Sequence, residues 1–124
     1  MKLRTKKVEE KVVIETPEGE VIFYGSPLTP KETSKLLSGC IKKSWERGQR
    51  FEEPDLYQFK VKKLQAVINR WTNVDDMDGN PMECIDDNKE LVYLFNSKLI
   101  DDALEKFDAL SESYQKEQEF LEKN

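Results

Sequence analysis

The sequence has no histidine and only two cysteines among its 124 residues. Without histidine, nucleophilic catalysis lacks its usual general base. Cys40 and Cys84 lie far apart and form no Cys-x-x-Cys pair, so neither a zinc site nor a redox motif is indicated. Cys40 falls on an apolar stripe and is expected to be a small buried hydrophobe. We therefore expect no enzyme activity and no cofactor.

The chain also lacks long apolar runs and a surplus of basic residues. Its start, MKLRTKK, is followed by no apolar stretch, which predicts neither a signal peptide nor a membrane span. Lysine and arginine number 20 against 25 acidic residues, a formal net charge of −5. A nucleic-acid binder needs a basic surplus to neutralise phosphates. These absences predict a cytoplasmic protein that contacts neither membranes nor nucleic acids.

The residues present suit one small domain with a highly charged surface. Apolar residues make up 37% of the chain and charged residues 36%, a leaner and more charged mixture than in an average domain. We expect a single domain over 1–124, whose parts follow in order along the chain. These are a flexible basic start at 1–7, a β-hairpin at 8–25, a helical body at 29–110, and a polar helical tail at 111–124 that frays.

The hairpin is predicted from two β-branched and aromatic runs, KVVIE at 11–15 and EVIFY at 20–24, which flank a Pro-Glu-Gly turn. Both faces of these strands carry apolar side chains. A lone two-stranded hairpin is marginal in water. We therefore expect helices on one face and a further element on the other face or along the open edge.

Helical signals dominate after the hairpin. Thr29-Pro30-Lys31-Glu32 has the form of a capping box, and apolar residues at helical spacing extend the predicted helix to Gly48, before a linker at 48–54. A second helix is expected from Leu56 to Trp71, with Leu64 and Ile68 in the core. A capping-box-like start at Asp87 opens two further helices. The sequence thus predicts an α+β fold, with an N-terminal β-hairpin followed by a mainly helical domain of about four helices.

The two tryptophans, Trp45 and Trp71, each fall at the end of an apolar stripe. We expect both to pack in the core, with the indole N–H near a loop carbonyl, and an exposed binding anchor is the less favoured alternative.

An acidic turn at 75–87 invites a metal-binding interpretation, since calcium prefers clustered carboxylates. If Gly79 took the invariant glycine position of a calcium loop, two ligand positions would fall on Val74 and Ile85, which cannot bind a cation. The turn is therefore interpreted as structural. A small metal-binding or otherwise catalytic protein built on this turn remains the less favoured alternative.

Apolar residues beyond what the core needs give the candidate partner-binding residues. Strands that are apolar on two sides tend to find another strand, and a terminal helix with little to bury tends to find another helix. We therefore expect self-association or partner binding through the hairpin and the C-terminal helix. The candidates are Val13, Phe23, Tyr114, Phe120 and Leu121.

The order of features from about residue 20 to about residue 110 resembles the tail assembly chaperones of long-tailed bacteriophages and prophages. The motifs that carry this resemblance are Pro27-Leu28-Thr29-Pro30-Lys31-Glu32 at a helix start, and Trp71 before Asp78-Gly79-Asn80-Pro81. By this resemblance Trp71, Asp78, Gly79 and Pro81 are structural markers, and none is catalytic.

The resemblance implies a protein made in the infected cell that binds the tape-measure protein during tail assembly. Such proteins are typically absent from the finished particle. A structural minor tail component that stays in the virion is the alternative.

Overall fold

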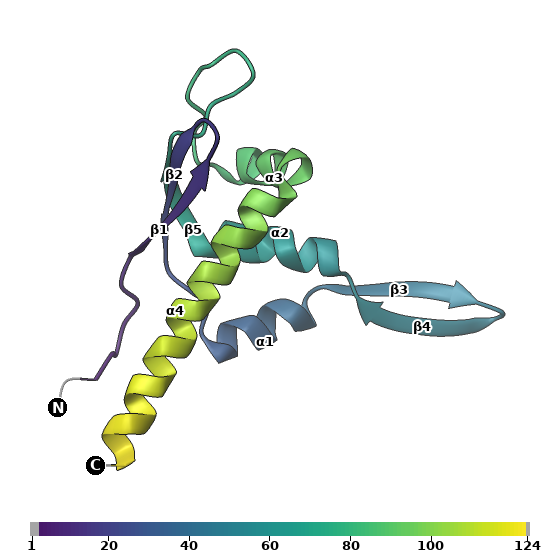
Figure 1. Cartoon of the computed structure of the whole chain (residues 1–124). Coiled ribbons are helices and arrows are strands. Elements are labelled where there is room, and N and C mark those ends of the chain that lie inside the picture. The colour runs from purple at the N-terminus through teal and green to yellow at the C-terminus, as the bar shows by residue number, and fades with distance from the viewer. Residues whose placement is uncertain (1–2, 124) are drawn as a thin grey trace.

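The computed structural model describes residues 3–123, and the side chains of residues 3–113. The described chain confirms the predicted α+β class, with an N-terminal hairpin and four helices (Figure 1). Its elements are, in order, β1 (Glu10–Thr16), β2 (Gly19–Gly25), α1 (Pro30–Ser38), β3 (Ile41–Glu46), β4 (Gln49–Pro54), α2 (Leu56–Val67), β5 (Ile68–Thr72), α3 (Asp86–Phe95) and α4 (Ser97–Lys123).

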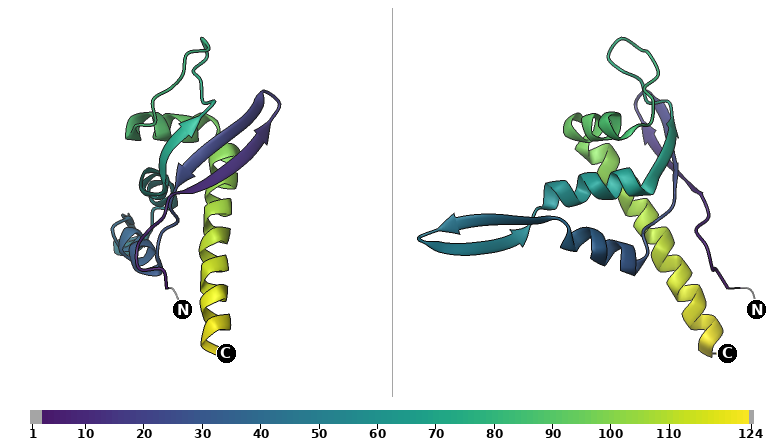
Figure 2. Two further views of the ribbon diagram at one scale, coloured as in Figure 1. Left: turned by 90° about the vertical axis from the view of Figure 1, so that its left-hand side faces the viewer. Right: turned by 180° about the vertical axis from the view of Figure 1, so that it is seen from behind.

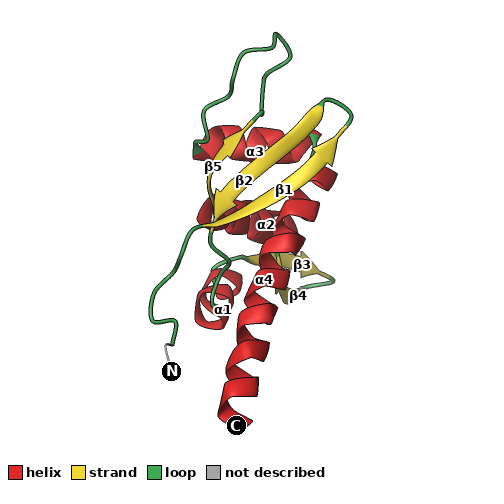
Figure 3. Cartoon of the chain, turned by 60° about the vertical axis from the view of Figure 1, so that its left-hand side comes forward, coloured by secondary structure: helices red, strands yellow, loops and turns green. Residues whose placement is uncertain are grey.

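An antiparallel sheet in the order β1-β2-β5 lies against helices α2, α3 and α4, which all lie on one side of it (Figure 3). Every second residue of the hairpin points toward the helices, as the strand pattern requires. Val12 pairs with Phe23 and Ile14 pairs with Val21, and all four are buried. Strand β5 pairs with the open edge of β2 and so supplies the further element that the hairpin needs.

The core fills the space between this sheet and the three helices. Leu64 and Ile68 have no exposed surface, as the α2 stripe predicts. Two lysines link helix α4 to α2 and to β1. Lys63 pairs with Asp108 at 2.7 Å, and Lys106 donates to the Val13 carbonyl at 3.0 Å.

Strand β2 and the end of α2 approach each other closely at Gly25. The Ser26 N–H donates to the Val67 carbonyl oxygen at 3.0 Å, and the β2–β5 register shifts between Tyr24 and Gly25. A Cβ atom on Gly25 would overlap that same carbonyl. Only glycine allows the backbones to approach this closely.

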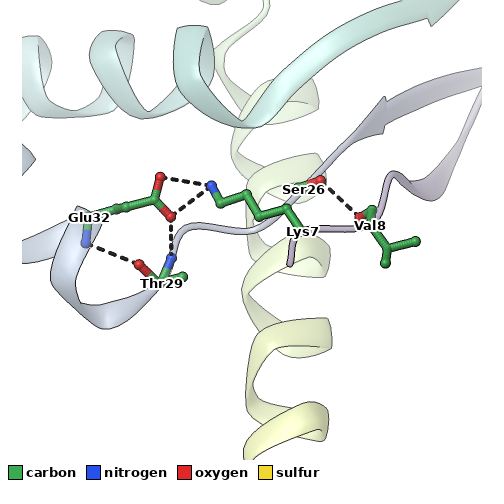
Figure 4. Close-up of polar contacts among 5 residues, drawn as sticks. All are labelled: Lys7, Val8, Ser26, Thr29 and Glu32. Carbon is green, nitrogen blue, oxygen red and sulfur yellow. Dashed lines mark hydrogen bonds and ion pairs between the residues drawn. The ribbon is translucent and has the colours of Figure 1, made fainter. Parts of the chain in front are cut away.

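The capping box at the start of α1 forms as predicted. The Thr29 hydroxyl accepts from the Glu32 N–H at 3.2 Å, and the Glu32 carboxylate accepts from the Thr29 N–H at 3.1 Å (Figure 4). Lys7 pairs with the same carboxylate at 2.7 Å, and the Ser26 hydroxyl donates to the Val8 carbonyl. The Lys7 hydrogen bond, followed by weaker effects, holds the pKa of Glu32 below its ordinary value. The N-terminal segment is thereby fastened to α1.

The helix predicted to run to Gly48 is wrong beyond Ser38, and so is the linker predicted at 48–54. Residues 41–54 form a two-stranded β-ribbon that projects from the body of the molecule (Figures 1 and 2). Arg47 and Gly48 both have positive φ, 53° and 78°, as a two-residue type I′ hairpin turn requires. Opposite charges face each other across the strands at Lys42–Glu53 and Lys43–Glu52. The turn and these pairs favour the ribbon, although the apolar spacing also fits a helix.

Two other boundaries differ from the prediction. Helix α2 ends at Val67, because the next residues pair with β2 as strand β5. Helix α3 starts at Asp86 without a side-chain cap, and Asn88 donates to the Glu83 carbonyl instead. The helical body predicted for 29–110 therefore contains three strands.

In the described part of the chain, no helix is both long and apolar enough to span a membrane.

Candidate protein-binding surfaces

The structure changes the set of candidate contact residues. Phe23 is wholly buried in the core, so its choice as a partner-binding residue is wrong. The inward face of β2 is covered by this chain's own helices, which the strand pattern alone does not reveal. Val13 lies on the opposite face of the hairpin and is half-buried. Tyr114, Phe120 and Leu121 lie outside the residues whose side chains are described.

Helix α3 has an inverted arrangement of polar and apolar side chains. It buries Lys89, which is 6% exposed, and presents three large apolar side chains to solvent. Leu91, Leu94 and Phe95 are 45%, 55% and 79% exposed, and their i, i+3, i+4 spacing places them on one side of the helix. We call these three residues the α3 stripe. We take this exposed apolar stripe as a candidate interaction surface.

Lys89 is buried because the body of the molecule supplies partners for its ammonium group. That group donates to the Gln65 carbonyl at 3.3 Å and pairs with the Asp86 carboxylate at 3.4 Å. The contacts fix the rotation of α3 about its axis, with Val92 and Lys89 facing inward and the stripe outward. The sequence does hold a signal for this surface. Leu91, Val92, Leu94 and Phe95 are spread around more of the helix circumference than one core can bury.

A pair of tyrosines joins α3 to the start of α2. The rings of Tyr57 and Tyr93 lie 5.9 Å apart, and the Tyr57 hydroxyl donates to the Glu90 carboxylate at 3.0 Å. Loss of solvent raises the pKa of both phenols, and the Glu90 contact adds to the increase at Tyr57. Both groups are therefore protonated at neutral pH and hold α3 against α2.

The projecting ribbon at 41–54, which we call the arm, is the second exposed surface. The pairing register places Ile41, Lys43 and Trp45 on one face with Arg50, and places Phe51 on the other. Trp45 is 74% exposed, so its predicted core position is wrong. At the base of the arm, Cys40 is buried as predicted, and its carbonyl accepts from the Asp55 N–H at 2.8 Å.

The acidic turn is held together by hydrogen bonds within the chain. The Asp76 carboxylate accepts from the backbone N–H groups of Asp78 and Asn80, both at 2.9 Å. Trp71 is partly buried and its indole N–H donates to the Met82 carbonyl at 2.8 Å, which confirms the predicted arrangement for this tryptophan. Within the described residues, no group of three or more acidic or cysteine side chains is placed to hold a metal ion.

Neither cysteine is arranged as a nucleophile. Burial raises the pKa of the Cys84 thiol, an effect that nearby Lys89 partly opposes, so the thiol is protonated at neutral pH. Cys40 has almost no exposed surface.

Comparison of the chain with family models, with curated proteins and with solved structures finds no match. The two exposed surfaces are therefore interpreted from their own geometry.

Proposed function

We propose that this protein is a non-enzymatic assembly factor that binds another protein through the α3 stripe. The observation that carries the proposal is the inversion of α3, which buries a lysine and exposes Leu91, Leu94 and Phe95. Anchors at i, i+3 and i+4 are the pattern by which one helix docks against a second amphipathic helix. The partner chemistry that fits is a long helical client with an apolar stripe of its own.

The resemblance of the sequence to phage tail assembly chaperones supplies a specific client, the tape-measure protein. A chaperone for a long helical client needs exposed apolar strips on a molecule that charge keeps in solution. Here 36% of the residues are charged. On this proposal the protein works in the cytoplasm of the infected cell and is absent from the mature virion.

The test is capture of a tape-measure candidate. The proposal requires that a very long coiled-coil-rich protein be encoded near this gene, and that protein is the client to use. The intact chain and a Leu94→Glu, Phe95→Lys variant are each co-expressed with it and recovered by affinity. We expect the variant to retain less than a tenth of the captured client, because charge placed at two of three anchors removes apolar contact and adds desolvation.

The matched control is Leu37→Glu, which charges an exposed leucine on α1 and leaves α3 unchanged. It is expected to capture the client as the intact chain does. Equal capture by the α3 variant and the intact chain would place the binding surface elsewhere. Mass spectrometry of purified particles separates the two roles, because a minor tail component is recovered in virions and a chaperone is not.

A form of the chain that ends at Leu110 tests the contribution of Tyr114, Phe120 and Leu121. If the C-terminal helix adds to client binding, this form captures less client than the full-length chain does, although its α3 stripe is unchanged. Unchanged capture assigns the contact to α3 alone.

A further inference from the structure

The tip of the arm combines an exposed indole with cationic side chains. Lys43 and Arg50 lie on the same face of the ribbon as Trp45, and Arg47 occupies the turn beside it. Glu46 and Glu53 lie on the opposite face by the same register, whereas Glu52 lies on the Trp45 face and pairs with Arg50 at 3.4 Å. Tryptophan and arginine are the residue types most enriched at the energetic centres of interfaces. The arm therefore presents an aromatic anchor surrounded mainly by positive charge.

A hollow of about 730 Å³ lies between the β1–β2 turn, the loop after β5, and the facing ends of α3 and α4. Val21, Val74 and Val92 are buried and form its apolar floor. Glu18 and Asp75 line it and are exposed. The rim is thus acidic and the floor apolar, which complements an indole flanked by cations.

The segment that includes the loop of the hollow is uniformly acidic. Residues 73–88 contain six acidic side chains and no lysine or arginine. Met77, within the loop that follows β5, has a fully exposed side chain. Met77 also lines the hollow, so the loop adds an apolar side chain to it.

The arm of one molecule cannot serve the hollow of the same molecule. The arm leaves the body beside α1 and α2, whereas the loop of the hollow projects from another side, next to the hairpin turn (Figures 1 and 2). Two complementary surfaces that point in different directions on one chain can meet only between copies. Such a contact is heterologous, so it joins molecules head to tail.

We propose that the arm tip of one copy docks into the hollow of a second copy, with Trp45 on the apolar floor and Arg47 against Glu18 and Asp75. The contact uses none of the α3 stripe, so it goes beyond the proposed client binding and can succeed or fail independently. An interface this small is weak, and we expect association at roughly 10–1000 μM chain. Repetition of the contact makes open or closed chains of copies.

Analytical ultracentrifugation of the purified full chain, without any client, tests this. The arm variant carries Trp45→Ala and Arg47→Glu, and the hollow variant carries Glu18→Lys and Asp75→Lys. Each changes exposed residues at one side of the contact only. Each variant alone is expected to lose at least tenfold in association constant, because its copies lack one of the two complementary surfaces.

A mixture of the two variants gives the decisive result. The intact arm of the hollow variant can enter the intact hollow of the arm variant, and no second contact can follow. We therefore expect a one-to-one dimer that does not grow further, whereas the intact chain forms larger species. A control with Lys31→Glu lowers the net charge by two, as Arg47→Glu does in the arm variant, and it should associate like the intact chain.

Three outcomes would overturn the proposal: an intact chain that is monomeric at 1 mM, a hollow variant that associates as the intact chain does, or a folded mixture that stays monomeric. The second outcome would indicate arm-to-arm pairing through the free strand edges. Circular dichroism checks the fold of each variant, and if the charge-reversed hollow does not fold, Glu18→Gln with Asp75→Asn takes its place in the mixture.

Discussion

The replacement of Leu64 by alanine tests whether the centre of the molecule lies between α2, α4 and the sheet. Leu64 has no exposed surface and belongs to the cluster that contains Phe23, Ile100 and Phe107. The change removes three carbon groups, which at roughly 0.8 kcal/mol each is about 2.4 kcal/mol of transfer free energy. The cavity left behind adds to this, so the expected loss in the free energy of unfolding is roughly 2.5–5 kcal/mol.

The same helix offers a matched control in Leu56→Ala. Leu56 is 71% exposed at the first turn of α2, so its loss is expected to change stability by less than about 0.5 kcal/mol. Both variants are compared with the intact chain by urea unfolding followed by circular dichroism and by tryptophan fluorescence. A loss below about 0.5 kcal/mol at Leu64, or equal losses at the two leucines, would mean that the core has been misplaced.

Three further predictions concern contacts outside the centre of the core. Gly25→Ala should lower the free energy of unfolding by more than ~2 kcal/mol, because its Cβ meets the Val67 carbonyl, whereas Gly39→Ala, with ordinary contacts and φ of −79°, should not; urea unfolding of the pair decides. Trp71→Phe removes the hydrogen bond to Met82 and should cost about 1 kcal/mol and speed amide hydrogen exchange in the acidic turn; unchanged exchange would contradict the role given to the indole. The Lys7–Glu32 pair lowers the pKa of Glu32 in the folded state, so its stabilisation is present above the ordinary glutamate pKa of about 4.3 and is lost as pH falls through the lowered value. Because both side chains are 42% exposed, Lys7→Ala should cost below ~1 kcal/mol at pH 7 and nothing measurable at pH 2, and equal losses at the two pH values would refute the linkage.

Local signals in the sequence were sufficient for the hairpin, the start of α1 and the centre of α2. The alternation at 11–24, the capping box at Thr29 and the stripe through Leu64 each depend on residues a few positions apart, and the structure has all three. The indole of Trp71 bonded to a loop carbonyl follows from the same kind of local reasoning.

The candidate contact residues could not be assigned in this way. Strand alternation shows that Phe23 and Ile22 point to opposite faces, but which face is covered depends on where α2, α3 and α4 pack. The same holds for α3, whose apolar residues exceed what one side can bury. The packing of Lys89 against the Gln65 carbonyl decides that Leu91, Leu94 and Phe95 are the ones left in solvent.

By itself, the sequence determined the class of fold and the elements whose stabilising contacts are close along the chain. The tertiary structure decided the strands β3, β4 and β5. Residues 68–71 continue the helical stripe of α2 and become a strand because the edge of β2, distant in sequence, offers unpaired hydrogen-bonding groups. Residues 41–46 fit a helix by spacing, but pairing with 49–54 across a two-residue turn forms a ribbon instead. Spacing along one segment cannot distinguish these states, because the partner strand that selects between them lies outside that segment.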